Sequence, residues 1–452
     1  MNAGDTTTAP RRPATAWPLE NALVSAAFAA QRWSWIDAPA RALGLTSFTR
    51  RQLTRQGLAQ IRRAADGRPT RLRTAFGTFL MPFSVDDAFT LVGRAEEAGA
   101  RGRVTALSDE GRRSTLSPHA APELPLRALL PRVRSLAVEE ARELLAARQA
   151  DGSVSRDDWC AVTRRLARRL VLGDAAADDP LIGDILEATL RSTEPDEHAD
   201  RAAALRRRVE PYVHDTHATP PAIGDDAVVE HALEIVTRAL TETAPQALAL
   251  LTVRPPLPGA DHIELTVTEA LRRYPPLAAT VHEVTAPFAW RDMTVETGTE
   301  ILCATAWLRD LDEDEGLVPA SEDPSTALCA APAPCAAAEL AVSAAVELLR
   351  ALTRRAEPVL CGSRLDPEAL PGTLPAASLT IALAETGAAS PAKVPGPVCR
   401  ARRPGLPPGG VPRTTRRSCR RAPGASRSTR AASRSARGSR AGTTTPSASS
   451  AV

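Results

Sequence analysis

The sequence predicts a mainly α-helical protein with a small β region and a disordered C-terminal tail. Three observations lead to this prediction. Most of residues 18–385 place apolar side chains at the helical spacing i, i+3 and i+4. Residues 287–308 instead alternate β-branched and polar side chains around a Gly-Thr turn. Residues 386–452 are rich in Arg, Pro, Ser and Gly and have almost no apolar periodicity.

Helices are predicted where the apolar spacing is most regular. The spacing predicts amphipathic or buried helices over 133–149, 157–173, 228–251 and 262–274. Pro275 and Pro276 end the last of these helices. A further helix is expected directly after Cys335, in AAAELAVSAAVELLRAL.

The β region is predicted in the C-terminal half. PFAWRDMTVETGTEILCATAWL, residues 287–308, reads as a β hairpin. Acids, Pro and Ser dominate residues 310–328, which predicts an irregular loop. A turn and a short strand follow in residues 366–383.

Charge and composition divide the chain into three parts. Residues 386–452 contain thirteen Arg, one Lys and no acid, so this tail carries +14 while the rest of the +3 chain carries −11. We therefore expect a disordered N-terminus over 1–17, a folded domain over 18–385 and a disordered tail over 386–452. Arginines suit nucleic-acid phosphates, but the tail has no aromatic residue to stack on bases, which weighs against a nucleic-acid partner.

The seven cysteines and the hydropathy suggest where the protein works. Their number is odd and their spacing is not repeated, which argues against a disulfide framework and for a reducing compartment, so we expect a cytoplasmic protein. No run of 18 or more uncharged apolar residues is present, and hence no membrane span is expected.

Two of the cysteines, Cys329 and Cys335, lie six positions apart before the predicted helix. A zinc site is not expected, because the stretch has neither a Cys-x-x-Cys pair nor a nearby His. Cys335 lies at the helix start, where the helix dipole and free N–H groups favour a thiolate. Cys329 is expected to fill the preceding loop as a small buried side chain.

Two pairs of polar residues lie upstream. Glu269 and Arg272 lie at i, i+3 on one helix face and are expected to form an ion pair. Glu242 and Thr243 put an acid next to an alcohol, and both groups can donate and accept protons.

The order of these features resembles the C-terminal half of the cytochromes P-450, the haem-thiolate monooxygenases. A Glu-x-x-Arg helix ending in RYPP is followed by a hairpin, a loop, and a Cys opening a helix 63 residues after Arg272. The resemblance spans residues 18–385 and is strongest over 228–352. It implies a cytochrome P-450-like helical fold with a small β region.

The resemblance also assigns roles to residues. LCAAPAPCAAAELA fits the family's cysteine motif with Cys335 on the position of the iron ligand, although Ala331 and Ala337 stand where the family has glycine. Such alanines are expected to strain the loop. In the central helix, Glu242 and Thr243 match the family's acid and alcohol, whereas Leu240 replaces a glycine and is expected to crowd the dioxygen site.

The remaining implied roles concern the haem itself. Glu269 and Arg272 would brace the core that bears the cysteine, and the loop 310–328 lacks the arginine that completes this network in the family. Arg112, Arg113 and His282 are candidates to hold the haem propionates.

The implied activity is the insertion of one oxygen atom from dioxygen into a small apolar substrate. Its cofactor would be haem b, and electrons would come from NAD(P)H through a ferredoxin or flavoprotein reductase. Two alternatives stay open: a degenerate, non-catalytic scaffold with weak or no haem binding, and association with nucleic acid through the basic tail.

Overall fold

The computed structural model describes residues 13–30, 49–107, 113–117, 119, 125–192, 194–213, 226–253, 261–316, 327–330, 335–362, 365–367 and 370–385. The predicted disordered tail over 386–452 lies outside these residues. So do residues 1–12 of the predicted disordered N-terminus, whereas Ala14–Thr15 form a short strand.

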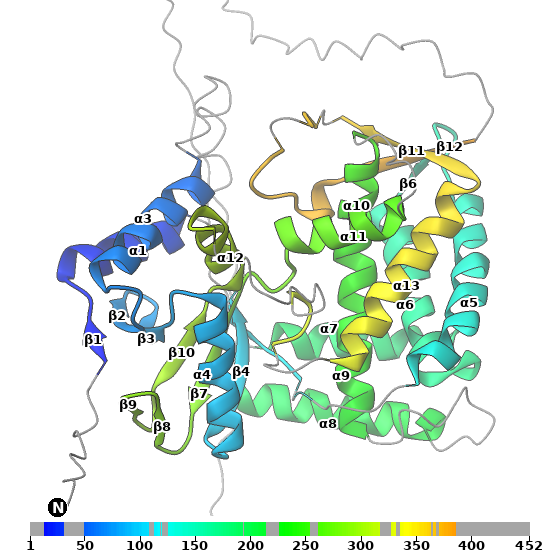
Figure 1. Cartoon of the computed structure of the whole chain (residues 1–452). Coiled ribbons are helices and arrows are strands. Elements are labelled where there is room, and N and C mark those ends of the chain that lie inside the picture. The colour runs from blue at the N-terminus through cyan, green and yellow to red at the C-terminus, as the bar shows by residue number, and fades with distance from the viewer. Residues whose placement is uncertain are drawn as a thin grey trace, which may run out of the picture. The chain divides into compact units, whose positions relative to one another are not determined.

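Helices make up most of the described chain (Figure 1). In chain order they are α1 (Pro18–Ala30), α3 (Arg50–Ala64), α4 (Val85–Glu97), α5 (Leu126–Ala146), α6 (Arg156–Leu172), η3 (Asp174–Ala176), α7 (Pro180–Arg191), α8 (Pro195–Val213), α9 (Asp226–Arg238), η4 (Ala239–Thr243), α10 (Ala244–Leu251), α11 (His262–Arg273), α12 (Thr305–Asp314), α13 (Ala336–Thr353) and η6 (Ala376–Ser378).

The strands form three sheets. They are β1 (Ala14–Thr15), β2 (Thr70–Thr74), β3 (Gly77–Met81), β4 (Arg101–Leu107), β5 (Arg113–Thr115), β6 (Ser153–Val154), β7 (Ala279–Val284), β8 (Phe288–Trp290), β9 (Met293–Val295), β10 (Glu300–Cys303), β11 (Ala356–Cys361) and β12 (Thr380–Glu385). The largest sheet has the order β1-β2-β3-β10-β7-β4-β5, in which β1–β2 and β3–β10 are parallel pairs. The antiparallel sheet β11-β12-β6 and the hairpin β8-β9 are separate.

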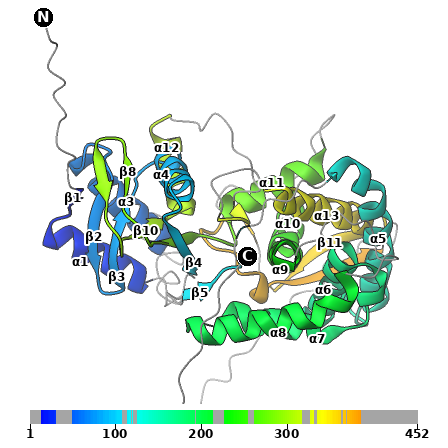
Figure 2. The same ribbon diagram turned by 90° about the horizontal axis from the view of Figure 1, so that it is seen from below.

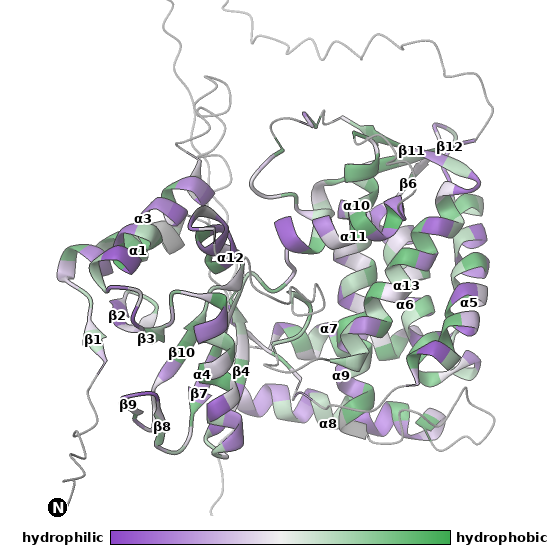
Figure 3. Cartoon of the chain, viewed as in Figure 1, coloured by the Kyte–Doolittle hydropathy of each residue, from purple (hydrophilic) through white to green (hydrophobic). Residues whose placement is uncertain are grey.

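The predicted helices are present. The predicted hairpin is present in part, because β8 pairs with β9 over 288–295, whereas Glu300–Cys303 joins the large sheet as β10 and residues 305–308 begin α12. The segments 133–149, 157–173 and 262–274 correspond to α5, α6 and α11, and 228–251 corresponds to α9, η4 and α10 together. The main helical core lies among α5, α6, α9, α10 and α13, whose apolar faces meet. Helix α10 is largely hydrophobic (Figure 3), as expected for a helix in which residues 244–250 are all buried.

The predicted irregular loop is wrong at its start, because residues 310–314 complete α12. Leu308 and Leu311 are buried in a second core beneath the large sheet. Asp312, buried on the same helix, accepts hydrogen bonds from Arg62 at 2.7 Å and from the backbone N–H of Val85 at 2.9 Å. This polar anchor explains why an acid-rich stretch remains helical.

Candidate functional site

The helices α9 and α10 form one long helix with a π-helical turn, η4, between them. They stand in one column in Figure 1 and overlap when viewed from below in Figure 2. The N–H of Ala244 bonds the carbonyl of Ala239, five residues back, so the carbonyl of Leu240 loses its usual partner. The indole Nε1 of Trp159 donates to that carbonyl at 3.0 Å.

Proline sets the position of this turn. Pro245 has no N–H for the carbonyl of Thr241, four residues earlier. The guanidinium of Arg156 donates to that carbonyl instead, at 2.7 Å. Two side chains at the start of α6 therefore satisfy both carbonyls that η4 leaves free.

Glu242 and Thr243, the predicted acid and alcohol, lie in this turn. Glu242 is half-buried and lines a hollow of ≈ 390 Å³ together with Gln246, Tyr274 and Trp307. The hydroxyl of Thr243 is buried and has no hydrogen-bond partner within the described part of the chain. The turn thus places one acid beside a space of small-molecule size and one buried hydroxyl next to it in sequence.

Cys335 lies where the sequence predicts, immediately before α13. Its carbonyl accepts the N–H groups of Ala338 and Glu339, so it caps the helix with extended backbone. The side chain is 1% exposed. Ala337, at one of the family's glycine positions, lies in the first helical turn and is not at positive φ, so the expected strain does not arise at this alanine.

The thiol of Cys335 belongs to a cluster of four side chains, His119, His231, Cys329 and Cys335, named the Cys/His cluster below. One ligand atom from each lies within 4.8 Å of the others. The Sγ of Cys335 is 3.4 Å from the Nε2 of His231, and the Sγ of Cys329 is 3.7 Å from the same nitrogen. The rings of His119 and His231 meet edge to face with centroids 5.3 Å apart.

Polar contacts to α9 hold the segments that carry His119 and Cys329. The backbone N–H of Ser117 donates to Glu234 at 3.0 Å, and its hydroxyl donates to Glu230 at 3.2 Å. Arg238, also on α9, donates to the carbonyl of Leu328 at 3.2 Å. Because His231 is on the same helix, these bonds hold cluster residues that are distant in sequence against the middle of α9.

The surroundings of Cys335 favour the charged thiolate. A hydrogen bond from the Cys329 thiol contributes most to holding the pKa of Cys335 well below its usual range. His119 and His231 add to the effect, and together these groups outweigh the opposing influence of burial. A buried thiolate next to two imidazoles has the donor chemistry of a metal ligand.

Glu269 and Arg272 are paired, as the spacing predicts. The Nε of Arg272 lies 3.0 Å from Oε2 of Glu269, and Arg273 also donates to this carboxylate. Arg272 further bonds Glu313 of α12. The bracing role that the resemblance implies stays a prediction.

The structure describes two of the three predicted propionate ligands, Arg113 and His282. Arg112 lies outside the described residues. Arg113 forms a two-pronged ion pair with Glu300 at 2.6 and 3.1 Å and lies over the ring of Phe79. These contacts already engage the cation of Arg113.

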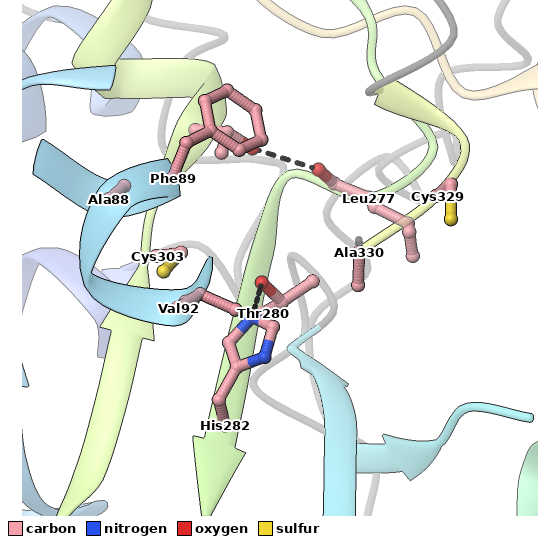
Figure 4. A pocket seen from close by; sticks show the side chains of 10 residues that line it. Ala88, Phe89, Val92, Leu277, Thr280, His282, Cys303, Cys329 and Ala330 are labelled. Atoms are coloured by element: carbon pink, nitrogen blue, oxygen red, sulfur yellow. Dashed lines mark hydrogen bonds between the residues drawn. The ribbon is translucent and has the colours of Figure 1, made fainter. Parts of the chain in front are cut away.

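His282 is buried on β7 and faces a small cavity of ≈ 20 Å³ (Figure 4). Its Nε2 bonds the hydroxyl of Thr280 at 2.9 Å, shown as a dashed line in Figure 4. Burial, with a smaller contribution from Arg101, lowers its pKa to about 3. A neutral ring offers no positive charge to a carboxylate, which weighs against a role in holding propionates. Cys329 lines the same cavity.

The residues around Cys335 do not fit haem as they are arranged here. The thiolate suits an iron ligand, but three other ligand atoms surround the sulfur. The cavity lined by His119, His231 and Cys329 is only ≈ 10 Å³, whereas cofactor sites commonly enclose about 300 to 1,000 Å³. In addition, Thr243 is twelve residues from His231 along one helix, about 18 Å at 1.5 Å per residue.

No zinc site was expected, because that prediction took account only of residues close to Cys335 in the sequence. His119 and His231, which are distant in the sequence, were therefore missed. Cys329 is likewise not mere loop filling, because its sulfur joins the Cys/His cluster. One signal was available in the sequence: His231 lies within the apolar run VVEHALEIV, where a buried imidazole needs a polar partner. Nothing in the sequence identified that partner.

Comparisons with known proteins support the fold. No protein-family model matches the chain, and no curated protein matches its sequence. The crystal structure of CYP108D1 from Novosphingobium aromaticivorans matches with a TM-score of 0.50 and 14% identity, covering 83% of this chain and 100% of that one.

Two further matches are weaker. CYP154C4 from a Streptomyces species has a TM-score of 0.48 and 18% identity, covering 73% of this chain and 96% of that one. A six-coordinated cytochrome P-450 from Thermus thermophilus has a TM-score of 0.46 and 18% identity, covering 73% and 98%. The first match, over the whole length of its partner, shows the fold of this chain.

Proposed function

We propose that this chain, which has the cytochrome P-450 fold, acts as a haem-thiolate monooxygenase that inserts one oxygen atom into a small apolar molecule. The observation that carries the proposal is the acidic, buried thiol of Cys335 at the start of α13, which packs against α9. A thiolate in this position of this fold has the chemistry of an axial iron ligand.

The π turn supports the proposal. Glu242 lines the hollow of ≈ 390 Å³, and Thr243 keeps a buried hydroxyl without a partner in the described chain. A small apolar substrate suits that hollow, whose lining includes Leu107, Trp307 and Leu374. For Glu242 and Thr243 to supply protons to the reacting centre, the rearrangement that admits haem would also have to bring the π turn close to Cys335.

Haem binding requires a rearrangement, since His231 and Cys329 must move away from the sulfur of Cys335. Electrons would come from NAD(P)H through a ferredoxin or flavoprotein reductase, and we expect the protein to work in the cytoplasm. No helix in the described part of the chain is long and apolar enough to cross a membrane.

The carbon monoxide difference spectrum of the reduced, haem-loaded, full-length protein tests the proposal. We expect the Soret band typical of thiolate ligation, its loss in Cys335→Ser, and its retention in the matched variant Cys361→Ser on β11. Absence of haem in the wild-type protein, or a band that survives Cys335→Ser, would refute the proposal.

The closed Cys/His cluster favours a second candidate, a non-catalytic scaffold with the same fold. This candidate predicts a folded protein that does not take up haem under any loading condition. Association with nucleic acid through residues 386–452 stays a separate prediction. It would appear as salt-sensitive retention on nucleic acid that is lost when the tail is deleted.

A further inference from the structure

The Cys/His cluster brings four protein ligands together, more than haem iron takes from a protein. Two thiols and two imidazoles come from four places: the segment after β5, helix α9, the loop before α13, and the start of α13. Neither cysteine forms a disulfide bond among the described residues. Two cysteines with two histidines form one of the common ligand sets of structural zinc sites.

The spacing of the atoms agrees with a tetrahedral metal. Zinc bonds of about 2.3 Å to sulfur and 2.0 to 2.1 Å to nitrogen place neighbouring ligand atoms about 3.3 to 3.8 Å apart in a tetrahedron. The two distances from the Nε2 of His231, 3.4 Å to Cys335 and 3.7 Å to Cys329, lie in this range. The largest separation in the cluster, within 4.8 Å, needs a contraction of about 1 Å.

One imidazole nitrogen in the cluster is buried without a partner. The Nε2 of His119 has no hydrogen-bond partner among the described residues. A buried polar atom normally has a partner, so an orphaned nitrogen on a residue of the Cys/His cluster indicates a missing ligand.

The supporting contacts resemble the outer shell of a metal site. Ser117, two residues before His119, donates hydrogen bonds to two buried glutamates of α9. Arg238 fixes the carbonyl of Leu328, next to Cys329. These bonds fix the two segments that carry His119 and Cys329 to α9, the helix of His231. A metal site requires such positioning of its ligands by neighbouring groups.

The geometry points to a zinc site in which His119, His231, Cys329 and Cys335 bind one Zn²⁺ ion and join α9 to α13. All four positions are taken by protein, so the ion would have a structural role and no open coordination position. The inference does not rest on the proposed monooxygenase activity. Because one thiolate of Cys335 cannot serve both metals at once, the zinc form is a haem-free form of the chain.

Metal content provides the first test. The full-length chain is purified under reducing conditions, loaded with Zn²⁺ and freed of excess metal, and zinc is measured per chain. We expect one zinc per wild-type chain. Co²⁺ in place of zinc should give the absorption of a tetrahedral site with thiolate ligands. Substoichiometric zinc together with an octahedral Co²⁺ spectrum would overturn the inference.

Variants that spare Cys335 separate this inference from the proposed function. Cys329→Ser and His119→Gln should each weaken zinc binding at least tenfold, while Cys361→Ser and His262→Gln, the matched changes outside the cluster, leave it unchanged. Haem uptake should survive or increase in the first two variants, because the axial cysteine remains. Zinc retained at wild-type affinity in the Cys329→Ser, His119→Gln double variant would refute the site, whatever the haem result.

Discussion

Two regions of the long helix made by α9, η4 and α10 differ in what they offer to a reaction: the segment around His231 and the π turn at the middle of the helix. Around His231, four metal-ligand side chains lie within 4.8 Å of one another and leave a cavity of ≈ 10 Å³. At the π turn there is a hollow of ≈ 390 Å³, in which Glu242 is the one acid among the described lining residues. Ligand chemistry and space are therefore separated by about 18 Å along the helix.

This difference shows that a set of motifs in the right order along the chain does not by itself assemble a site. The cytochrome P-450 resemblance places Cys335 and the Glu242–Thr243 pair around one haem. In this structure the thiol of Cys335 instead contacts His231. The following predictions test the Cys/His cluster, the π turn and their surroundings separately, from the largest expected effect to the smallest.

The largest effect is expected at the Cys/His cluster. Zinc at a free concentration 1,000 times its dissociation constant should raise the free energy of unfolding by about 4 kcal/mol, because only the folded chain presents all four ligands. The midpoint of thermal unfolding, measured with zinc and after chelation, reports this change. At the same zinc concentration the His119→Gln variant should gain at least about 1.4 kcal/mol less, because its zinc affinity is at least tenfold weaker, and an equal zinc effect in that variant would contradict the prediction.

At the π turn, Trp159→Phe should lower the free energy of unfolding by ~2 kcal/mol. The substitution removes the indole N–H and leaves the buried carbonyl of Leu240 without its partner. Urea unfolding measures the change through its midpoint. Trp17→Phe is the matched control, since Trp17 is 75% exposed, and it should alter stability by less than about 0.5 kcal/mol.

The next prediction concerns His282, which lines the same cavity as Cys329, and tests whether its ring stays neutral in the folded chain. The pKa of His282 in the folded chain is about 3, below the ordinary value of 6.5. Between these two pH values the unfolded chain binds a proton on His282 and the folded chain does not. This contribution to stability is complete above pH 6.5 and is lost progressively as the pH falls toward 3. Between pH 7 and pH 5 the loss is about 2 kcal/mol.

His282→Gln should remove that dependence while keeping a side chain that can bond Thr280. Urea unfolding at pH 7 and pH 5 compares the two proteins. If the wild-type and variant proteins lose the same stability over this interval, His282 does not stay neutral in the folded chain.

The smallest effect is expected for Glu269→Gln. The carboxylate bonds Arg272 and Arg273, but both guanidiniums are partly exposed to solvent. We expect a loss of about 1 kcal/mol at low salt that shrinks as ionic strength rises. Urea unfolding at two salt concentrations measures it. A large loss that is independent of salt would instead indicate that the pair braces a buried part of the core.

Local patterns in the sequence predicted much of the fold. The helical spacing in 133–149 and 157–173 identified α5 and α6, because each helix has one apolar face that must be buried. The alternation around Trp290 and Met293 identified the hairpin β8-β9. Helix α12 was missed, because residues 305–308 were assigned to the hairpin and 310–314 to a loop, and its stability depends on Asp312 meeting Arg62 from a distant helix.

The candidate site was predicted less completely. Cys335 was found because its place before a helix is a local property. Ala337 was expected to cause strain and does not, as the first turn of α13 includes it. The partners His119 and His231 were missed because they lie more than 200 and more than 100 positions, respectively, from Cys335, and sequence spacing carries no information on contacts over that range.

The sequence by itself determined α5, α6, α11, α13 and the long helix of α9, η4 and α10, together with the hairpin β8-β9, the thiol at a helix start and the acid-alcohol pair. Each of these depends on neighbours a few residues away. Only the tertiary structure decided what surrounds the thiol. Ser117 bonds two glutamates of α9, and Arg238 bonds the carbonyl of Leu328, so long-range contacts bring His119, His231 and Cys329 to Cys335. A metal site depends on distances between atoms in space, which local patterns along a chain do not contain.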